Sequence, residues 1–307
     1  MRLAGFLLTL LLAVQPAAAH GPAPVQPDAL WQAWSFEPLV IVPLLLAHWA
    51  YGRGVLQLWT RAGRWRGIGP FNVLSFLLGE AALVVALVSP LDRLGGTLLS
   101  AHMAQHGLLV IIAPPLLLAG QPGVAFAWAL PKGWSRSTMT ARLWRPLARF
   151  GQMPSRPLPA AVLHGLALWA WHAPRLYDAA VEREWLHMLE HASFFGTGLL
   201  FWRAVLGARS SRSAALALGA AFATLMHSGL LGALITMAPR PLYSWYGGRT
   251  ELWGWTPLED QQLAGVLMWV PMGVIYFGTC LLLAWKLVAP ADVPTWSGAS
   301  GRSATLR

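Results

Sequence analysis

Residues 101–122 read AHMAQHGLLVIIAPPLLLAGQP, and this stretch combines two features. Two histidines lie four residues apart at its start, inside an apolar run long enough for a membrane-spanning helix. A second pair lies in HMLEH at residues 187–191, also within an apolar stretch. Histidine is costly in the hydrocarbon core of a bilayer and usually marks a functional path there. The two pairs therefore predict a membrane protein with a metal site.

The composition also indicates a membrane protein. Of the 307 residues, 56% are hydrophobic and only 11% are charged, and 18 are tryptophans. The net charge of +10 would suggest nucleic acid as a partner of a soluble chain, but here the basic residues lie in short loops between apolar runs. A nucleic-acid partner is therefore rejected. Cys280 is the only cysteine, so a site for a soft metal has to use histidine and methionine.

Apolar windows of about 20 residues predict an all-α fold, a polytopic membrane bundle of seven transmembrane helices after a signal peptide. The signal peptide is expected at residues 1–19, and an uncleaved first span is the alternative. An outer N-terminal segment is expected at 20–36, the seven-helix domain at 37–288, and a flexible cytoplasmic tail at 289–307.

The seven helices are expected at 37–55, 71–90, 99–119, 157–175, 185–206, 213–237 and 261–287. The third is expected to bend at Pro114 and Pro115, which lack the backbone N–H of a regular helix. A short polar turn over residues 175–184 is expected between the fourth and the fifth.

The basic residues predict the orientation of the bundle. Sixteen Lys and Arg residues lie in the loops after the first, third and fifth helices and at the C-terminus, against five on the opposite side. Because loops rich in Lys and Arg stay in the cytoplasm, the mature N-terminus is expected outside and the C-terminus in the cytoplasm.

This orientation places six histidines of four helices in the outer half of the bilayer. Imidazole together with thioether suits copper, since soft sulfur ligands select Cu(I). The predicted metal ligands are His102, His106, His187, His191, His172 and His227, with Met103 and Met226 beside two of them. The lone histidines His48 and His164 are instead expected to hydrogen-bond to neighbouring helices.

Three further residues bear on the predicted site. Glu190 is three residues from His187 and could orient its imidazole as a hydrogen-bond acceptor. Glu80 could pair with a histidine across the bundle or carry a proton, and the sequence leaves both open. If the signal is cleaved after Ala19, the free amine and imidazole of His20 would form an accessory copper site; an ordinary flexible terminus is the alternative.

Four segments resemble the CtaG family of multi-span cytochrome c oxidase assembly factors. They read AHMAQHGLLVIIAPPLLLAGQP, LWAWHAPRLYDAAVEREWLHMLEHASFFGTGLLFW, LMHSGLLGALITMAPRPLYSWY and EDQQLAGVLMWVPMGVIYF. The resemblance runs from about residue 30 to 288. It places the family's motifs at His102 and His106, His187 and His191, Trp171 and His172, Met226 and His227, and Asp260, Gln261 and Gln262.

The resemblance implies a protein of the bacterial inner membrane that assists delivery of copper to a haem-copper oxidase. The implied partners are an oxidase subunit and a periplasmic copper donor. Asp260 of the DQQ motif is expected to support the metal ligands.

Two other functions fit parts of the sequence. HMLEH matches the HxxEH pattern of zinc metalloenzymes, in which the glutamate acts as a base, but the sequence identifies no third ligand. Paired histidines also occur in haem-carrying electron-transfer proteins. Their spacing of four, however, puts both rings at one depth, whereas two stacked haems need histidines widely separated along each helix.

Overall fold

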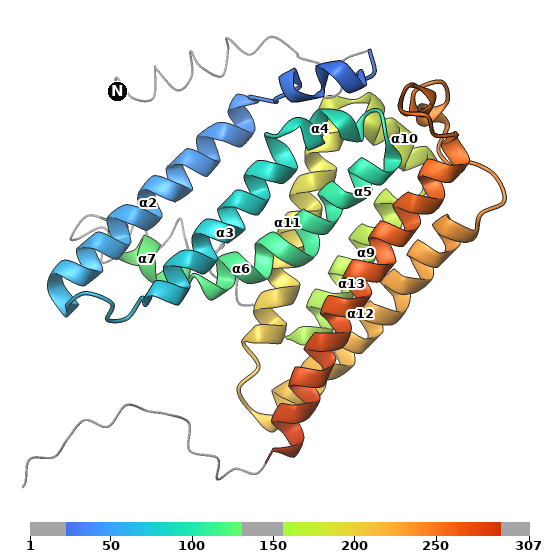
Figure 1. The fold of residues 1–307 in the computed structure, drawn as a ribbon. Helices are drawn as coiled ribbons and strands as arrows, with labels where there is room; N and C mark the ends of the chain where they lie inside the picture. The colour runs from blue at the N-terminus through green and yellow to red at the C-terminus, as the bar shows by residue number, and fades with distance from the viewer. Residues whose placement is uncertain (1–22, 131–155, 290–307) are drawn as a thin grey trace, which may run out of the picture.

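The computed structural model describes residues 23–130 and 156–289, and within these ranges the chain forms helices and no strands (Figure 1). The all-α prediction is therefore confirmed for the described residues. The predicted signal peptide, His20 and nearly all of the predicted tail lie outside them.

A long helical segment lies at each of the seven predicted ranges. These segments are α2 (Pro38–Ala62), α3 (Pro70–Leu87), the run from α5 (Leu99–Gly107) to α6 (Ala113–Ala119), α9 (Pro157–Trp171), α11 (Glu184–Leu206), α12 (Ser211–Met237) and α13 (Pro257–Val288). Five of them, all except α9 and α11, are long and apolar enough to cross a membrane. Helix α9 is apolar but has only 15 residues, and α11 carries the polar HMLEH pair.

Shorter helices connect these segments, and one of them corrects the sequence prediction. Residues expected to form a polar turn after the fourth span form α10 (Pro174–Glu182) instead. The other short helices are η1 (Pro27–Gln32), α4 (Pro90–Gly95), α7 (Pro122–Ala129), η5 (Ser244–Tyr246) and η6 (Thr250–Trp253). Helices α4 and α10 lie at one end of the bundle (Figure 1).

Proline fixes where many of these helices begin. A proline occupies the first turn of α2, α3, α4, α7, α9, α10 and α13. At that position the ring fixes φ near its helical value, and the missing N–H would have no partner within the helix anyway. The predicted starts of α2, α3 and α9 lie within one residue of these prolines.

The third span is interrupted just before the two prolines at which the sequence predicted a bend. A π-helical turn, η2 (Leu108–Ile112), separates α5 from α6. Pro114 has no N–H to donate to the carbonyl four residues earlier, that of Val110. The indole N–H of Trp202 in α11 donates to the Val110 carbonyl instead, at 2.8 Å. This bond gives the Val110 carbonyl a donor and joins the π-helical turn to α11. The candidate site lies between α11 and α5.

Candidate metal centre

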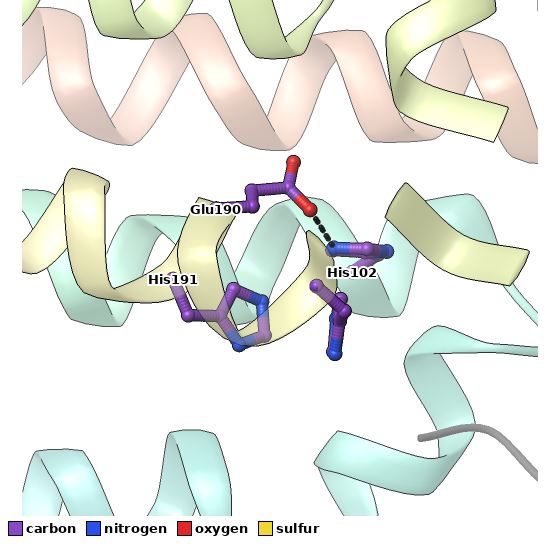
Figure 2. Close-up of side chains that lie close together, drawn as sticks. His102, Glu190 and His191 are labelled. Carbon is purple, nitrogen blue, oxygen red and sulfur yellow. Dashed lines mark ion pairs between the residues drawn. The ribbon is translucent and has the colours of Figure 1, made fainter. Parts of the chain in front are cut away.

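Two neighbouring helices place five potential metal ligands in one cluster. Helix α5 contributes His102 and His106, and α11 contributes His187, Glu190 and His191. Residues three or four apart share one face of a helix, so each helix presents its ligands on one side. Single ligand atoms of His102, His187, Glu190 and His191 all lie within 4.8 Å of one another. Figure 2 shows Glu190 and His102 approaching each other from the two helices.

The distances place His106 in the same cluster. Glu190 Oε1 lies 3.6 Å from His106 Nε2, and Glu190 Oε2 lies 3.9 Å from His102 Nε2. The ring centroids of His102 and His106 are 4.3 Å apart, and those of His106 and His191 are 5.4 Å apart. Each of the five side chains is buried, and Glu190 has no exposed surface.

The cluster has the properties of a cation site. Neither oxygen of Glu190 and neither ring nitrogen of His106 makes a hydrogen bond within the described residues. Buried polar atoms without hydrogen-bond partners are rare and costly, and a bound cation would satisfy these four. Imidazole nitrogens with one carboxylate suit transition metals such as copper or zinc, whereas Mg²⁺ and Ca²⁺ prefer oxygen ligands alone.

A chain of hydrogen bonds fixes the orientation of His102. Its Nδ1 lies 2.8 Å from the hydroxyl of Tyr177 in α10, which lies 2.8 Å from the hydroxyl of Tyr246 in η5. The Tyr246 hydroxyl donates to the Gly95 carbonyl at 2.9 Å. Burial raises the pKa of both tyrosines well above the usual value, so both hydroxyls keep their protons.

One arrangement of protons satisfies all three of these bonds. Because the Gly95 carbonyl can only accept, Tyr246 donates to it and accepts from Tyr177. Tyr177 has then used its proton and must accept from the Nδ1–H of His102. In a neutral imidazole this leaves Nε2 without a proton, and Nε2 is the nitrogen that faces Glu190.

His172 and Met103 lie at the edge of the cluster. The His172 ring centroid is 5.7 Å from that of His106, and its Nδ1 donates to the Leu168 carbonyl at 2.7 Å. Its Nε2 lies 3.4 Å from the sulfur of Met103, which is fully buried. A second pair of atoms that can bind a soft metal therefore adjoins the five central ligands.

The other two predicted ligands lie apart from the cluster. Met226 is 51% exposed and lines an apolar groove between α12 and α13. His227 lies on the same helix, and its ring packs against Gly165 of α9. Neither residue contributes to the group of ligand atoms around Glu190.

The predicted supporting carboxylates have different partners. Glu80 pairs with His48 of α2, with 2.7 Å between Oε2 and Nδ1. Asp260 of α13 caps α5: it accepts hydrogen bonds from the backbone N–H groups of Leu99 at 2.6 Å and Ser100 at 3.3 Å. A carboxylate at this position satisfies N–H groups that have no partner within the helix and interacts favourably with the helix dipole. Asp260 thereby holds the helix that carries His102.

The sequence did not identify the tyrosines or Gln105 as parts of the site. Gln105 lies between the two histidines of α5, and its amide donates to Asp92 Oδ1 at 2.8 Å and to the Ala86 carbonyl at 2.7 Å. Tyr177 and Tyr246 both lie within the segments that carry the family resemblance, but no spacing rule connects them to His102. The lone histidine His164 makes the expected hydrogen bond, to Thr197 at 2.9 Å.

The chain is similar in sequence to a known family and to proteins of mycobacteria. No solved structure matches it. The uncharacterized protein Mb0105 of Mycobacterium bovis is 26% identical over 273 residues, and the uncharacterized protein ML1998 of Mycobacterium leprae is 25% identical over 284 residues. Each alignment covers 86% of this chain but only 41% of the relative, so the chain spans about two fifths of the length of these relatives. The family model described as cytochrome c oxidase caa3 assembly factor (Caa3_CtaG) matches residues 49–289, and the chain therefore belongs to this family.

Proposed function

We propose that this assembly factor binds copper as Cu(I) on the outer side of the bacterial inner membrane and delivers it to a haem-copper oxidase. The protein would cross the membrane seven times, with the mature N-terminus outside, and a periplasmic donor would supply the ion. This is a binding and transfer function, in which no bond of the protein or the oxidase breaks.

The observation that carries the proposal is the convergence of four imidazoles and one carboxylate from α5 and α11. Ring centroids 4.0 to 5.7 Å apart allow one ion to pass between neighbouring ligands with small movements. Transfer requires such stepwise exchange, because an ion held in one rigid cage would not leave. The adjoining thioether of Met103 favours copper over zinc, since thioethers bind Cu(I) preferentially.

Copper content of the purified protein tests this proposal. We expect the full chain, purified in detergent under reducing conditions, to bind Cu(I), and the double variant His102→Ala with His106→Ala to lose it. His48→Ala is the matched control, because its ring pairs with Glu80 away from the cluster. Equal copper in the wild type and the double variant would contradict the proposed ligands.

Oxidase assembly provides the second measurement. Cells that carry the double variant in place of the wild type should accumulate oxidase that lacks copper and activity, whereas His48→Ala should assemble normal oxidase. His227→Ala should also keep its copper, because His227 lies apart from the clustered ligands. Loss of copper in His227→Ala would require a site that extends to α12.

A zinc metalloenzyme is the second candidate, and one observation favours it. His102 supplies the third protein ligand that the HxxEH sequence alone lacks. Glu190 would then act as a base on a zinc-bound water. Zinc bound more tightly than Cu(I), with a peptidase activity abolished in Glu190→Gln, would replace copper delivery as the function.

A further inference from the structure

A groove on the side of the bundle leads to the cluster of five candidate ligands. Its volume is about 360 Å³, and side chains of α2, α3 and α11 and of the π-helical turn line it. The lining is apolar, with one exception, His191. Because His191 also belongs to the cluster, it connects the groove to the other four ligands.

The opposite side of the cluster is closed. Tyr177 and Tyr246 are buried against His102, and the ring of Tyr243 packs on Tyr177 with 4.2 Å between centroids. Asp178 of α10 accepts hydrogen bonds from the backbone N–H and the hydroxyl of Ser244 at 3.1 and 2.6 Å, which fastens α10 to η5. The layer between the ligands and this end of the bundle is therefore held by specific contacts.

The exposed fractions of the five ligands also indicate that the cluster is most accessible on the groove side. Exposure is 0% for His102 and 1% for His106, and it is largest, at 7%, for His191. The ligand nearest to the surface is thus the one that lines the groove.

Met188 supplies a soft ligand on the groove wall. It lies three residues before His191 on α11, a spacing that puts both side chains on one face of the helix. An ion bound to His191 can therefore exchange to the Met188 sulfur without crossing the apolar lining unliganded.

We propose that copper leaves the cluster sideways through this groove, from His191 to Met188, and passes to an acceptor within the bilayer. The inference rests on the proposed copper function and adds its route. In the exchange, a Cu–N bond to His191 breaks as a Cu–S bond to Met188 forms. The imidazole stays neutral, copper stays Cu(I), and neither a proton nor an electron moves.

Two chelators of Cu(I) test the route on the full chain in lipid nanodiscs. Neocuproine partitions into lipid, whereas bathocuproine disulfonate is charged and stays in water. We expect neocuproine to remove Cu(I) from the wild type faster. If bathocuproine disulfonate removes it as fast or faster, the ion leaves on the water side and the route is wrong.

Matched variants test the groove itself. Leu44→Trp fills the groove from α2, opposite the ligands, and Leu230→Trp fills the separate apolar groove between α12 and α13. We expect Leu44→Trp to keep its copper and to slow release to neocuproine by about tenfold or more, which corresponds to about 1.4 kcal/mol in the barrier. Leu230→Trp should release at the wild-type rate. Equal rates for the two variants would overturn the proposal.

A conservative change tests the thioether and guards against misfolding of the tryptophan variants. Met188→Leu keeps the shape of the groove wall and removes the sulfur, and Met226→Leu is its control in the other groove. We expect Met188→Leu alone to slow the transfer, by about fivefold. An unchanged rate would remove Met188 from the route. A wild type that binds no copper would instead overturn the proposed function.

Discussion

Glu190 is a residue for which metal binding and the stability of the metal-free protein make opposite demands. Its carboxylate is fully buried among imidazoles, and its oxygens make no hydrogen bond within the described residues. Burying a carboxylate without a hydrogen-bond partner is unfavourable. A cation between Glu190 and the histidines would offset that cost, so the cluster is better adapted to the metal-loaded protein than to the metal-free one.

Substitution of Glu190 should therefore act with opposite sign in the two states. We expect Glu190→Gln to stabilise the metal-free protein by about 1–3 kcal/mol, because a buried carboxylate without hydrogen-bond partners is removed. The same variant should bind Cu(I) more weakly and gain less thermal stability when copper is added. Thermal unfolding with and without Cu(I) measures both effects, and a metal-free variant less stable than the wild type would contradict this account.

The tyrosine chain predicts a second effect on copper affinity. Tyr177→Phe keeps the ring and removes the hydroxyl that holds His102 with Nε2 toward Glu190. Loss of such an orienting partner typically weakens metal binding by about 10–100-fold. We expect Tyr177→Phe and Tyr246→Phe to weaken Cu(I) binding to this extent in competition titrations.

Tyr276→Phe is the matched control for both tyrosine variants. Its ring is equally buried, and its hydroxyl lies near His164, at 3.5 Å, rather than at the cluster. If all three variants weaken copper binding alike, the effect reflects general packing and not the orientation of His102.

The two histidine pairs could be predicted from the sequence, but the tyrosines that hydrogen-bond to His102 could not. Spacing alone indicated His102 with His106 and His187 with His191, because residues four apart share a helix face. Tyr177 and Tyr246 are 75 and 144 residues away from His102 along the chain. Contacts at such separations depend on how helices pack, which no local pattern encodes.

At the scale of elements, α5 and the π-helical turn after it are held by four neighbouring helices, α13, α4, α3 and α11. Asp260 caps its first turn, Gln105 joins its centre to α4 and α3, and Trp202 of α11 binds the Val110 carbonyl at the bend. The sequence predicted the span and its bend from its apolar length and its prolines. It did not predict α7 or α10, which have eight and nine residues and lack the length of a spanning segment.

The hydrogen bond between Gln105 of α5 and Asp92 of α4 should make the stability of the fold depend on pH. Burial raises the pKa of Asp92 to about 7, although hydrogen bonds from Gln105 and Ser35 act to lower it. In the unfolded chain an aspartate has a pKa of about 4. The folded state therefore favours the protonated acid. The stability that this protonated acid contributes is complete below about pH 4 and is lost as the pH rises through about 7, by a total of about 4 kcal/mol.

The variant Asp92→Asn isolates this contribution, because its amide stays neutral at every pH. We expect the melting temperature of the wild type to fall between pH 5 and pH 8 by more than that of Asp92→Asn. Glu251→Gln changes an exposed acid and should keep the wild-type dependence. Parallel curves for the wild type and Asp92→Asn would show that Asp92 does not carry this effect.

At the scale of the whole molecule, delivery of a metal from the outer side depends on where the cluster lies in the bundle as well as on its ligands. The layer that closes it is built from α4, α10 and η5, which the charge pattern predicts to lie outside. With that orientation, a metal held there would lie on the side of the bundle away from the cytoplasm. Delivery to an oxidase from the outer side therefore depends on the orientation of the chain.

Cysteine labelling tests this orientation. Cys280→Ser removes the only cysteine, and single cysteines are then introduced at Glu251, before α13, and at Arg209, between α11 and α12; both positions are exposed. In spheroplasts, a membrane-impermeant maleimide should label Glu251→Cys directly and Arg209→Cys only after permeabilisation, because loops rich in arginine stay in the cytoplasm. The reverse pattern would turn the cluster toward the cytoplasm, and copper could then no longer reach it from a periplasmic donor.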